Sequence, residues 1–306
     1  MSGALKLRLP ATSANLGPGF DASAIALDFH LEIEARPAGE FSINATGRNA
    51  DRCAKIEKNL ILEIYKGLLQ AIGKPIVPLA IEMNNGIPLG MGCGSSAAGR
   101  LAGIALAVHF GGLAWNGDRI LEEACFLEGH PDNAAACWLG GFVTAAAENR
   151  TIHLAKVIPP VDWRAIIVLP ATPLATVKAR AVLPNSYSRA DAVTNIQSAA
   201  LLGLAFAQAR PELLQIAMRD RIHQPYRAAI CPLLPRLLPL AGKHGIAGIA
   251  LSGAGPAVLA VVAREADLAA ASTAIREALT GEEETELLVS SFLSDGAEQG
   301  IERLAL

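Results

Sequence analysis

The stretch Pro88-Leu-Gly-Met-Gly-Cys-Gly-Ser-Ser-Ala-Ala98 constrains this chain more than any other segment. Its glycines, at 90, 92 and 94, run into two serines and an alanine-rich segment that reads as a helix over 95–109. Glycine adopts positive φ and lets a backbone approach a ligand closely. Because the first helical turn has unpartnered N–H groups, such a junction favours a bound anion, most often phosphate. A plain glycine turn before a capped helix accounts for the same residues.

The two best-known phosphate loops do not fit this stretch. No Gly-Lys-Ser/Thr follows the glycines, so it is not a Walker A loop. The alternate spacing of the glycines also breaks the Gly-x-Gly-x-x-Gly pattern of dinucleotide-binding proteins. A phosphate site here therefore belongs to another fold. Ser95 and Ser96 either cap the helix or reach a metal ion bound to the phosphate.

Composition narrows the class of protein. The 306 residues are 52% hydrophobic and 18% charged, which predicts a sizeable core in one large or two moderate domains. A net charge of −3 indicates neither nucleic acid nor an anionic membrane as a partner. We find no apolar run of membrane-spanning length and no secretory leader pattern. Five cysteines without a Cys-x-x-Cys pair favour free thiols and a cytoplasmic location.

Short strands and helices alternate along the chain, which predicts an α+β architecture of two layers. Pro159-Pro160 marks the predicted boundary between domains 1–158 and 159–306. The expected strands are 4–9, 24–36, 77–83, 142–147, 151–157, 165–169, 246–251, 257–263 and 286–292. The expected helices are 59–72, 95–109, 116–127, 134–139, 188–209 and 266–279, together with short helical pieces after Pro211 and around 231–243.

Further motifs identify a family. Pro10-Ala-Thr-Ser-Ala-Asn-Leu-Gly-Pro-Gly-Phe-Asp21 precedes the glycine loop, and Leu251-Ser-Gly-Ala-Gly-Pro-Ala257 follows it. In this order the three motifs resemble those of the GHMP kinase superfamily. Glu128-Gly-His-Pro-Asp-Asn133, Thr176-Val-Lys-Ala-Arg-Ala-Val-Leu-Pro184 and His223-Gln-Pro-Tyr-Arg227 resemble the homoserine kinases in particular. The resemblance spans residues 8–262. Cys93 departs from the usual leucine, but its side chain is also small and apolar.

The resemblance implies a fold and an activity. It implies an N-terminal, ATP-binding domain like domain 2 of ribosomal protein S5, followed by a ferredoxin-like C-terminal domain. The implied reaction transfers phosphate from ATP, with Mg²⁺, to the hydroxyl of L-homoserine, giving O-phospho-L-homoserine for threonine biosynthesis. A homodimer is compatible with the sequence, which does not determine the oligomeric state.

The expected nucleotide and metal sites follow from the loop. The metal ligands are expected to be Glu128 and the Ser96 hydroxyl, because Mg²⁺ prefers a few protein oxygens plus phosphate and water. Glu128 also has no basic neighbour in sequence, while Glu122 and Glu123 remain alternatives. The residues expected to bind the nucleotide are Pro88, Leu89, Gly90, Met91, Gly92, Cys93, Gly94, Ser95, Ser96, Ala97, Ala98 and, at its base or ribose, Asn59.

The acceptor site is expected to recognise a zwitterion. Arginines suit the substrate carboxylate, because they form paired hydrogen bonds with it; the candidates are Arg180 and Arg227. Asp21 and Asn15 are expected to accept from the ammonium group. Asp132 either caps a helix or accepts from the reacting hydroxyl, and whether it also takes the proton stays open. The expected catalytic residues are Asp132, Ser96 and Glu128, and the expected supporting contacts are His130, Asn133, Thr176, Gly253 and Ser252.

Two other functions compete with this interpretation. One is a kinase for another small alcohol, such as mevalonate or a diphosphocytidyl intermediate. The other is a non-catalytic member that binds a metabolite. The two arginines together with Asp21 favour an acceptor that carries both ammonium and carboxylate. The presence of Ser96, Glu128 and Asp132 argues against a loss of catalysis.

Overall fold

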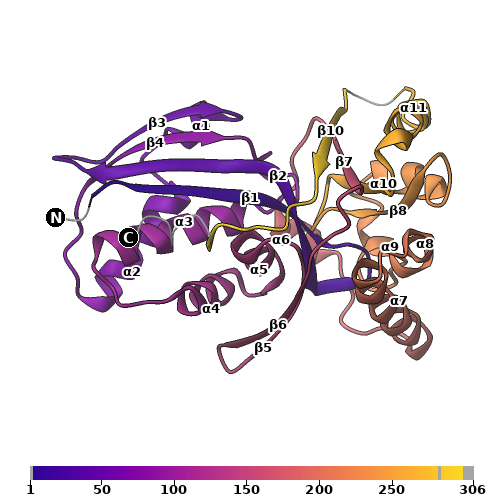
Figure 1. Cartoon of the computed structure of the whole chain (residues 1–306), viewed down its shortest axis with the longest axis horizontal. Helices are drawn as coiled ribbons and strands as arrows, with labels where there is room; N and C mark the ends of the chain where they lie inside the picture. The colour runs from indigo at the N-terminus through magenta and orange to yellow at the C-terminus, as the bar shows by residue number, and fades with distance from the viewer. Residues whose placement is uncertain (1–2, 282–283, 299–306) are drawn as a thin grey trace.

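Two β-sheets with their helices make up the protein (Figure 1). The computed structural model describes residues 3–281 and 284–298. The first sheet has the order β3-β4-β2-β5-β6, and β1 pairs with β2. Its strands are β1 (Leu5–Asn15), β2 (Gly19–Pro37), β3 (Ser42–Gly47), β4 (Leu79–Asn85), β5 (Phe142–Glu148) and β6 (Thr151–Val157). The N-terminal half is therefore a sheet with one antiparallel hairpin, β1–β2, along its length.

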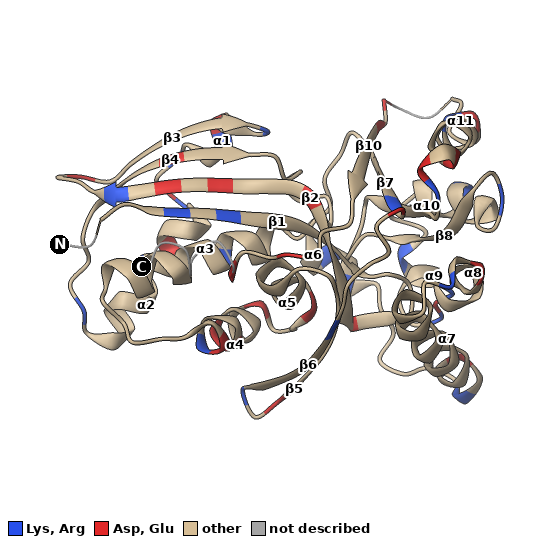
Figure 2. Ribbon diagram, viewed as in Figure 1, with Lys and Arg blue, Asp and Glu red and all other residues tan. Residues whose placement is uncertain are grey.

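This hairpin is longer than the sequence predicted. The two strands were expected at 4–9 and 24–36, but both continue into the first motif and meet at residues 16–18. The sequence did not show these parts of the strands, because polar and apolar residues do not alternate there. Polar residues of the motif lie in the core instead, and Thr12 and Ser13 are fully buried. Outside the motif the alternation is clear. Lys6 and Arg8 face outward and form salt bridges with glutamates of β2, where Figure 2 shows basic and acidic residues side by side.

Helices cover the other face of this sheet (Figure 1). They are α2 (Leu60–Ile72), α3 (Ser95–Phe110), α4 (Gly117–Glu128) and α5 (Asp132–Leu139), with the short α1 (Ala50–Cys53) beside β3. The central helix α3 is almost entirely buried, because its alanines and glycines let neighbours approach closely. A Cβ on Gly103 would lie 2.7 Å from the Ile61 carbonyl oxygen. The long helix predicted after the glycine loop is thus confirmed.

The second sheet has the antiparallel order β10-β7-β9-β8. Its strands are β7 (Arg164–Leu169), β8 (Ile246–Leu251), β9 (Val258–Val262) and β10 (Glu286–Ser291). In chain order this is the 4-1-3-2 arrangement of a ferredoxin-like domain. Alternate residues of β7 enter different cores: Ile167 joins the core shared with the first sheet, whereas Ile166 and Val168 pack under α10 and α11. Both faces of the sheet are therefore buried.

The helical segments of the second half lie between β7 and β8 or follow β9. They are α6 (Thr176–Ala181), α7 (Arg189–Ala207), α8 (Leu214–Ala217), α9 (Gln224–Arg227), α10 (Leu233–Leu237) and α11 (Leu268–Ala278), with 3₁₀ turns at Pro211–Leu213, Leu238–Leu240 and Glu265–Asp267. The sequence did not predict α6 as a helix. No helix among the described residues combines the length and apolarity needed to cross a membrane.

The two sheets share one core. The rings of Phe142 on β5 and Phe206 on α7 stack with centroids 4.5 Å apart. After β10 the chain returns to the first sheet, where the Leu293 amide donates to the Ala26 carbonyl at 3.1 Å. The predicted boundary at 158/159 falls in the connection between β6 and β7, and its exact position stays a prediction.

Candidate active site

The three motifs meet through main-chain and side-chain hydrogen bonds. The Thr12 amide donates to the Cys93 carbonyl at 3.1 Å, and the Gly253 amide donates to Ala14 at 3.0 Å. The buried hydroxyl of Ser252 donates to the carbonyl oxygen of Gly92 at 2.8 Å. The Ser252 hydroxyl and the Gly253 N–H, expected to face a ligand, therefore hold the motifs together instead. Gly253 still lines the pocket they enclose.

The glycine loop has the backbone shape that its composition predicts. Gly90, Gly92 and Gly94 have φ angles of 72°, 81° and 72°. Gly94 is the residue before α3, and Ser95 and Ser96 form the first turn, so the serines do not cap the helix through their side chains. Their amides have no partner among residues 3–281 and 284–298. The loop therefore presents free donors at the N-terminus of a helix, the arrangement that favours an anion.

A small pocket opens in front of this loop, with a volume of about 130 Å³. Its walls come from both halves of the chain. It collects most of the residues predicted for the active site, although they are far apart in sequence. They are Asn15, Asp21, Gly90, Gly92, Cys93, Gly94, Ser95, Ser96, Glu128, His130, Asp132, Asn133, Thr176, Arg180, Arg227 and Gly253, joined by Leu174 and Ala254.

A second pocket, of about 320 Å³, adjoins the first and shares Gly90, Ser95 and Ser96 with it. Leu89 and Asn59 line this second pocket. The Asn59 amide group is already engaged, because its oxygen caps α2 and its nitrogen donates to the carbonyls of Cys53 and Lys55. The other predicted nucleotide residues lie elsewhere: Pro88 and Met91 line a different pocket, and Ala97 and Ala98 are buried within α3. Two adjoining pockets with the glycine loop between them could hold two ligands side by side.

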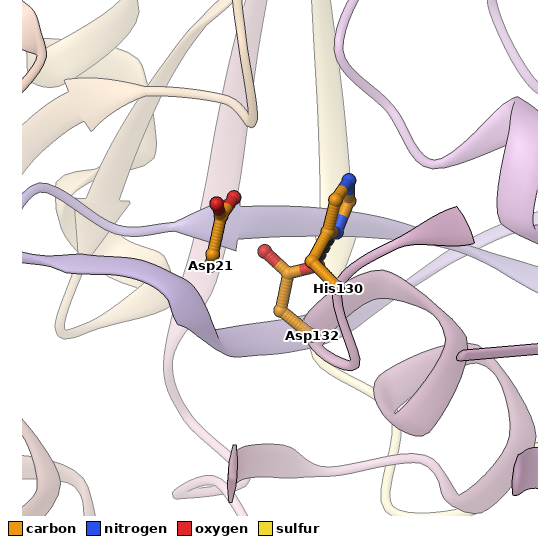
Figure 3. Close-up of side chains that lie close together, drawn as sticks. All are labelled: Asp21, His130 and Asp132. Atoms are coloured by element: carbon orange, nitrogen blue, oxygen red, sulfur yellow. Dashed lines mark hydrogen bonds and ion pairs between the residues drawn. The ribbon is translucent and has the colours of Figure 1, made fainter. Parts of the chain in front are cut away.

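Asp132, His130 and Asp21 converge on the small pocket (Figure 3). Among the described residues, one carboxylate oxygen of Asp132 accepts all of the hydrogen bonds that this carboxylate receives, including those from His130 at 2.6 Å and from the Asn133 amide at 2.6 Å. The other oxygen points toward Asp21 (Figure 3). Burial alone would lower the pKa of His130, but the hydrogen bond and charge of Asp132 outweigh it and raise that pKa. Asp132 is thus a buried, oriented acceptor whose second oxygen accepts no hydrogen bond from residues 3–281 or 284–298.

Arg180 forms an ion pair with Asp21, so its guanidinium already has a carboxylate partner within the protein. The guanidinium donates to both carboxylate oxygens, at 2.9 and 2.6 Å, and this bond raises the arginine's pKa. The Asn15 side chain is also engaged, because its oxygen accepts from the Asp21 amide and its nitrogen donates to Gly253. The sequence assigned Arg180 and Asp21 to opposite ends of a substrate. It could not show that residues 159 positions apart form a pair.

Arg227 is a buried cation, 1% exposed. Its Nε donates to the Ala179 carbonyl at 3.0 Å, and its Nη1 donates to His223 Nδ1 at 3.0 Å. Burial, followed by the charge of Arg180, lowers its pKa. Its hydrogen-bond acceptors among the described residues are neutral, and Nη2 has none. Arg227 therefore offers an anion a guanidinium that no carboxylate of the described residues contacts directly, with Nη2 available to donate.

Two supporting residues escaped the sequence analysis. His223 is fully buried, donates through Nε2 to the Gly17 carbonyl at 2.8 Å and accepts at Nδ1 from Arg227, so one neutral tautomer fits both contacts. It links the first motif to Arg227. Phe20 stacks on His223 and lies within 5.5 Å of both the Arg180 and Arg227 guanidinium carbons. Phe20 belongs to the first motif and His223 to the motif that ends at Arg227, but only the fold shows what the two side chains contact.

His223 makes stability sensitive to acid. Burial lowers the pKa of His223 to about 4, below the 6.5 of an exposed histidine. The unfolded chain therefore binds the proton first, and the stabilising contribution, complete above pH 6.5, is lost as the pH falls toward 4. At pH 5 we expect a loss of about 2 kcal/mol from this residue. Denaturant unfolding at pH 7.5 and 5.0 tests this; His223→Gln should lose less stability between the two pH values, and an equal loss would contradict the assignment.

Ser96 and Glu128 meet as predicted, with Ser96 Oγ 3.4 Å from a Glu128 carboxylate oxygen. Glu128 has no basic neighbour in sequence, but it has one in space, because Arg100 from α3 forms an ion pair with it and also donates to Ser96. Arg100 lies 28 residues before Glu128 in sequence, and only the packing of α3 against the end of α4 brings them together. The alternatives Glu122 and Glu123 do not line the small pocket and pair with Arg119, and Glu123 also pairs with Arg150.

Known proteins share this architecture and sequence. Residues 59–141 match the family described as GHMP kinases N terminal domain, and residues 204–281 match GHMP kinases C terminal. The homoserine kinase of Solibacter usitatus (strain Ellin6076) is 45% identical over 254 residues, 83% of each chain. The crystal structure of homoserine kinase from Cytophaga hutchinsonii ATCC 33406 has a TM-score of 0.82 at 26% identity, covering 97% of each chain.

The chain belongs to the homoserine kinase family. As GHMP kinases, homoserine kinases use ATP as phosphoryl donor. The predicted family and the two-domain α+β fold are confirmed. The mevalonate kinase of L. major in complex with R-mevalonate has a TM-score of 0.72 at 13% identity, so the fold alone does not select the acceptor. The roles of single residues in this member of the homoserine kinases stay predictions.

Proposed function

We propose that this protein transfers the terminal phosphoryl group of ATP to the side-chain hydroxyl of L-homoserine, giving O-phospho-L-homoserine for threonine biosynthesis. The observation that carries the proposal is the small pocket itself. Three groups surround a volume of about 130 Å³ next to the glycine loop. They are Arg227, which no carboxylate of the described residues contacts, the Asp21 carboxylate and the buried Asp132 carboxylate. A small zwitterion with a hydroxyl fits such a set of groups. We also propose a cytoplasmic location, and a homodimer stays a prediction.

Arg227 supports the recognition of the substrate carboxylate. It is buried, its hydrogen bonds go to neutral acceptors, and its Nη2 faces no acceptor among the described residues. A guanidinium in this state gains most from a carboxylate, because the charge has already been taken out of water. We assign the carboxylate first to Arg227 and second to Arg180, whose charge Asp21 already neutralises.

Asp21 supports the recognition of the ammonium group. Its carboxylate is about one-third exposed and lines the pocket, with its backbone amide held by Asn15. A zwitterion can bind between Asp21 and the two arginines with its ammonium group against the Asp21 carboxylate and its carboxylate against the guanidinium groups. Each charged group of the substrate then contacts a group of opposite charge. Thr176 lies on the same face of α6 as Arg180, one turn earlier, and also lines the pocket.

Asp132 supports the positioning of the reacting hydroxyl. Its free oxygen is directed into the space between Asp132 and Asp21 (Figure 3), while His130 and Asn133 hold the other oxygen. Asn133 is itself held by the Thr12 hydroxyl at 2.7 Å, so the carboxylate is anchored to the first motif. An acceptor fixed in this way aligns the hydroxyl oxygen for attack, which is the larger part of catalysis in phosphoryl transfer.

The glycine loop and Glu128 support the binding of MgATP. Free amides at the start of α3 face the junction of the two pockets, where the transferred phosphate must lie. Ser96 Oγ and the Glu128 carboxylate are oxygen donors close together, the kind of donor set that Mg²⁺ accepts when phosphates and water complete it. Mg²⁺ would supply neutralisation of phosphate charge.

An acceptor panel tests the proposal. The purified protein, ATP and Mg²⁺ are incubated with homoserine, 3-amino-1-propanol, which lacks the carboxylate, and mevalonate, which lacks the ammonium group. We expect phosphorylated homoserine by ³¹P NMR and mass spectrometry, with a kcat/KM at least tenfold above that of either analogue. A higher kcat/KM on mevalonate would replace homoserine as the acceptor, and no turnover of any alcohol would favour a non-catalytic binding protein.

A further inference from the structure

Arg100 occupies a position that the mechanism above leaves unexplained. It lies one turn after Ser96 on α3, and its Nη1 donates both to the Ser96 hydroxyl and to the Glu128 carboxylate. The three side chains form a closed group at the edge of the small pocket, and the exposed fractions of Arg100 and Glu128 are only 22% and 10%. The two oxygen donors that suit Mg²⁺ thus already share a cation.

The Glu128 carboxylate cannot bind both Arg100 and a metal ion at the same place. A mostly buried carboxylate needs a compensating charge, and Arg100 supplies it. A divalent ion bound by Ser96 and Glu128 would lie beside the guanidinium, since all three groups are in direct contact. Two cations at that separation repel strongly in a partly buried site. Either the guanidinium leaves the two oxygens or the ion binds elsewhere.

We propose that Arg100 is a resident counter-ion that competes with the metal for Ser96 and Glu128, and so sets the metal affinity of the site. In the absence of nucleotide, the ion pair holds the Glu128 carboxylate in place and keeps metal binding weak. When nucleotide binds, its phosphate oxygens reach the start of α3 and offer the guanidinium another acceptor. Metal and nucleotide then bind cooperatively, because the nucleotide draws away the metal's competitor.

This inference rests on the proposed metal ligands but not on the identity of the acceptor. It differs from an ordinary structural ion pair in one measurable way. Removing the charge of a structural pair leaves metal affinity unchanged or lowers it, whereas removing a competitor raises it. Arg119 offers a matched control, because it also pairs with helix α4 glutamates but lies outside the small pocket.

The test measures Mn²⁺ binding to the full-length protein at pH 8 by the EPR signal of free Mn²⁺, with and without ADP. We expect Arg100→Gln and Arg100→Met to bind Mn²⁺ at least tenfold more tightly than the unmodified protein without ADP, and the cooperativity with ADP to shrink by the same factor. Arg100→Lys and Arg119→Gln should resemble the unmodified protein. Glu128→Gln should abolish the tight site in the Arg100→Gln background. Unchanged or weaker Mn²⁺ binding by folded Arg100→Gln would overturn the proposal.

A second measurement does not depend on the folding of any variant. In crystals of the unmodified protein with ADP and Mn²⁺, the Arg100 guanidinium should have left hydrogen-bond distance of Glu128, with Mn²⁺ on the Glu128 carboxylate. An intact Arg100–Glu128 pair beside the bound metal would contradict the competition. The acceptor panel separates this outcome from the proposed function, because homoserine phosphorylation can succeed whether or not Arg100 competes.

Discussion

Replacing Gly94 with valine is expected to weaken nucleotide binding by more than a hundredfold. Gly94 has a φ of 72°, which residues with a Cβ rarely adopt, and an added Cβ would lie 1.9 Å from Thr12 Oγ1. The loop must therefore move at the residue that precedes α3, and its amides no longer converge on the phosphates. Titration calorimetry with ADP and Mg²⁺ measures the loss, and circular dichroism checks the fold.

Gly112→Val is the matched control for this change. Gly112 also has a positive φ, 60°, but lies after α3, and an added Cβ there would meet nothing within 4 Å. It carries the same backbone strain without disturbing the loop, so its nucleotide affinity should equal that of the unmodified protein. A folded Gly94→Val variant with full affinity would remove the glycine loop from the nucleotide site.

Replacing Arg227 with leucine is expected to lower kcat/KM for homoserine roughly ten- to more than a hundredfold. A charge-assisted hydrogen bond to a carboxylate contributes about 1.5–3 kcal/mol, and Arg227 is the buried arginine of the pocket whose charge no aspartate contacts. Arg227→Lys keeps the positive charge but loses the paired N–H donors of the guanidinium, so its kcat/KM should lie between those of the unmodified enzyme and Arg227→Leu. ADP affinity should change little, because Arg227 lines only the small pocket of the two that adjoin at the loop.

The substrates supply the control for this variant. 3-Amino-1-propanol and the methyl ester of homoserine lack a free carboxylate, so Arg227→Leu should alter their kcat/KM far less than that of homoserine. Because Arg227 also holds the Ala179 carbonyl and His223, a misfolded variant would lose activity on every acceptor equally. An equal loss on homoserine and its ester by a folded enzyme would make Arg227 structural and would withdraw the main support for a carboxylate-bearing acceptor.

Most of the fold could be predicted from local patterns. Helix α3 follows from alanine-rich sequence after a glycine loop, and α2 follows Asn59, a residue type that caps helices. The hairpin β1–β2 was predicted too short, because the alternation of core and surface residues stops where the strands enter the first motif and both faces become buried. Helix α6 was not predicted, since it is short and gets its position from packing beside the pocket.

The candidate site divides in the same way. Most of the residues that the sequence singled out, Asp132 and Arg227 among them, line one pocket, and they could be found because their chemistry and motif positions are local properties. Their partners were not predictable. The Asp21–Arg180 and Glu128–Arg100 pairs join residues 159 and 28 positions apart, and nothing in either local sequence indicates the contact.

The sequence by itself determined the family, the ATP-dependent chemistry and the residue types of the site. Motif order, glycine positions and side-chain chemistry depend only on the order and identity of the residues, and need no knowledge of tertiary contacts. Only the tertiary structure decided which charges are already neutralised. Arg180 pairs with Asp21 and Arg100 pairs with Glu128, whereas Arg227 hydrogen-bonds only neutral acceptors among the described residues. The physical reason is that ion pairing depends on distance in space and on burial, and both arise when segments remote in sequence pack together.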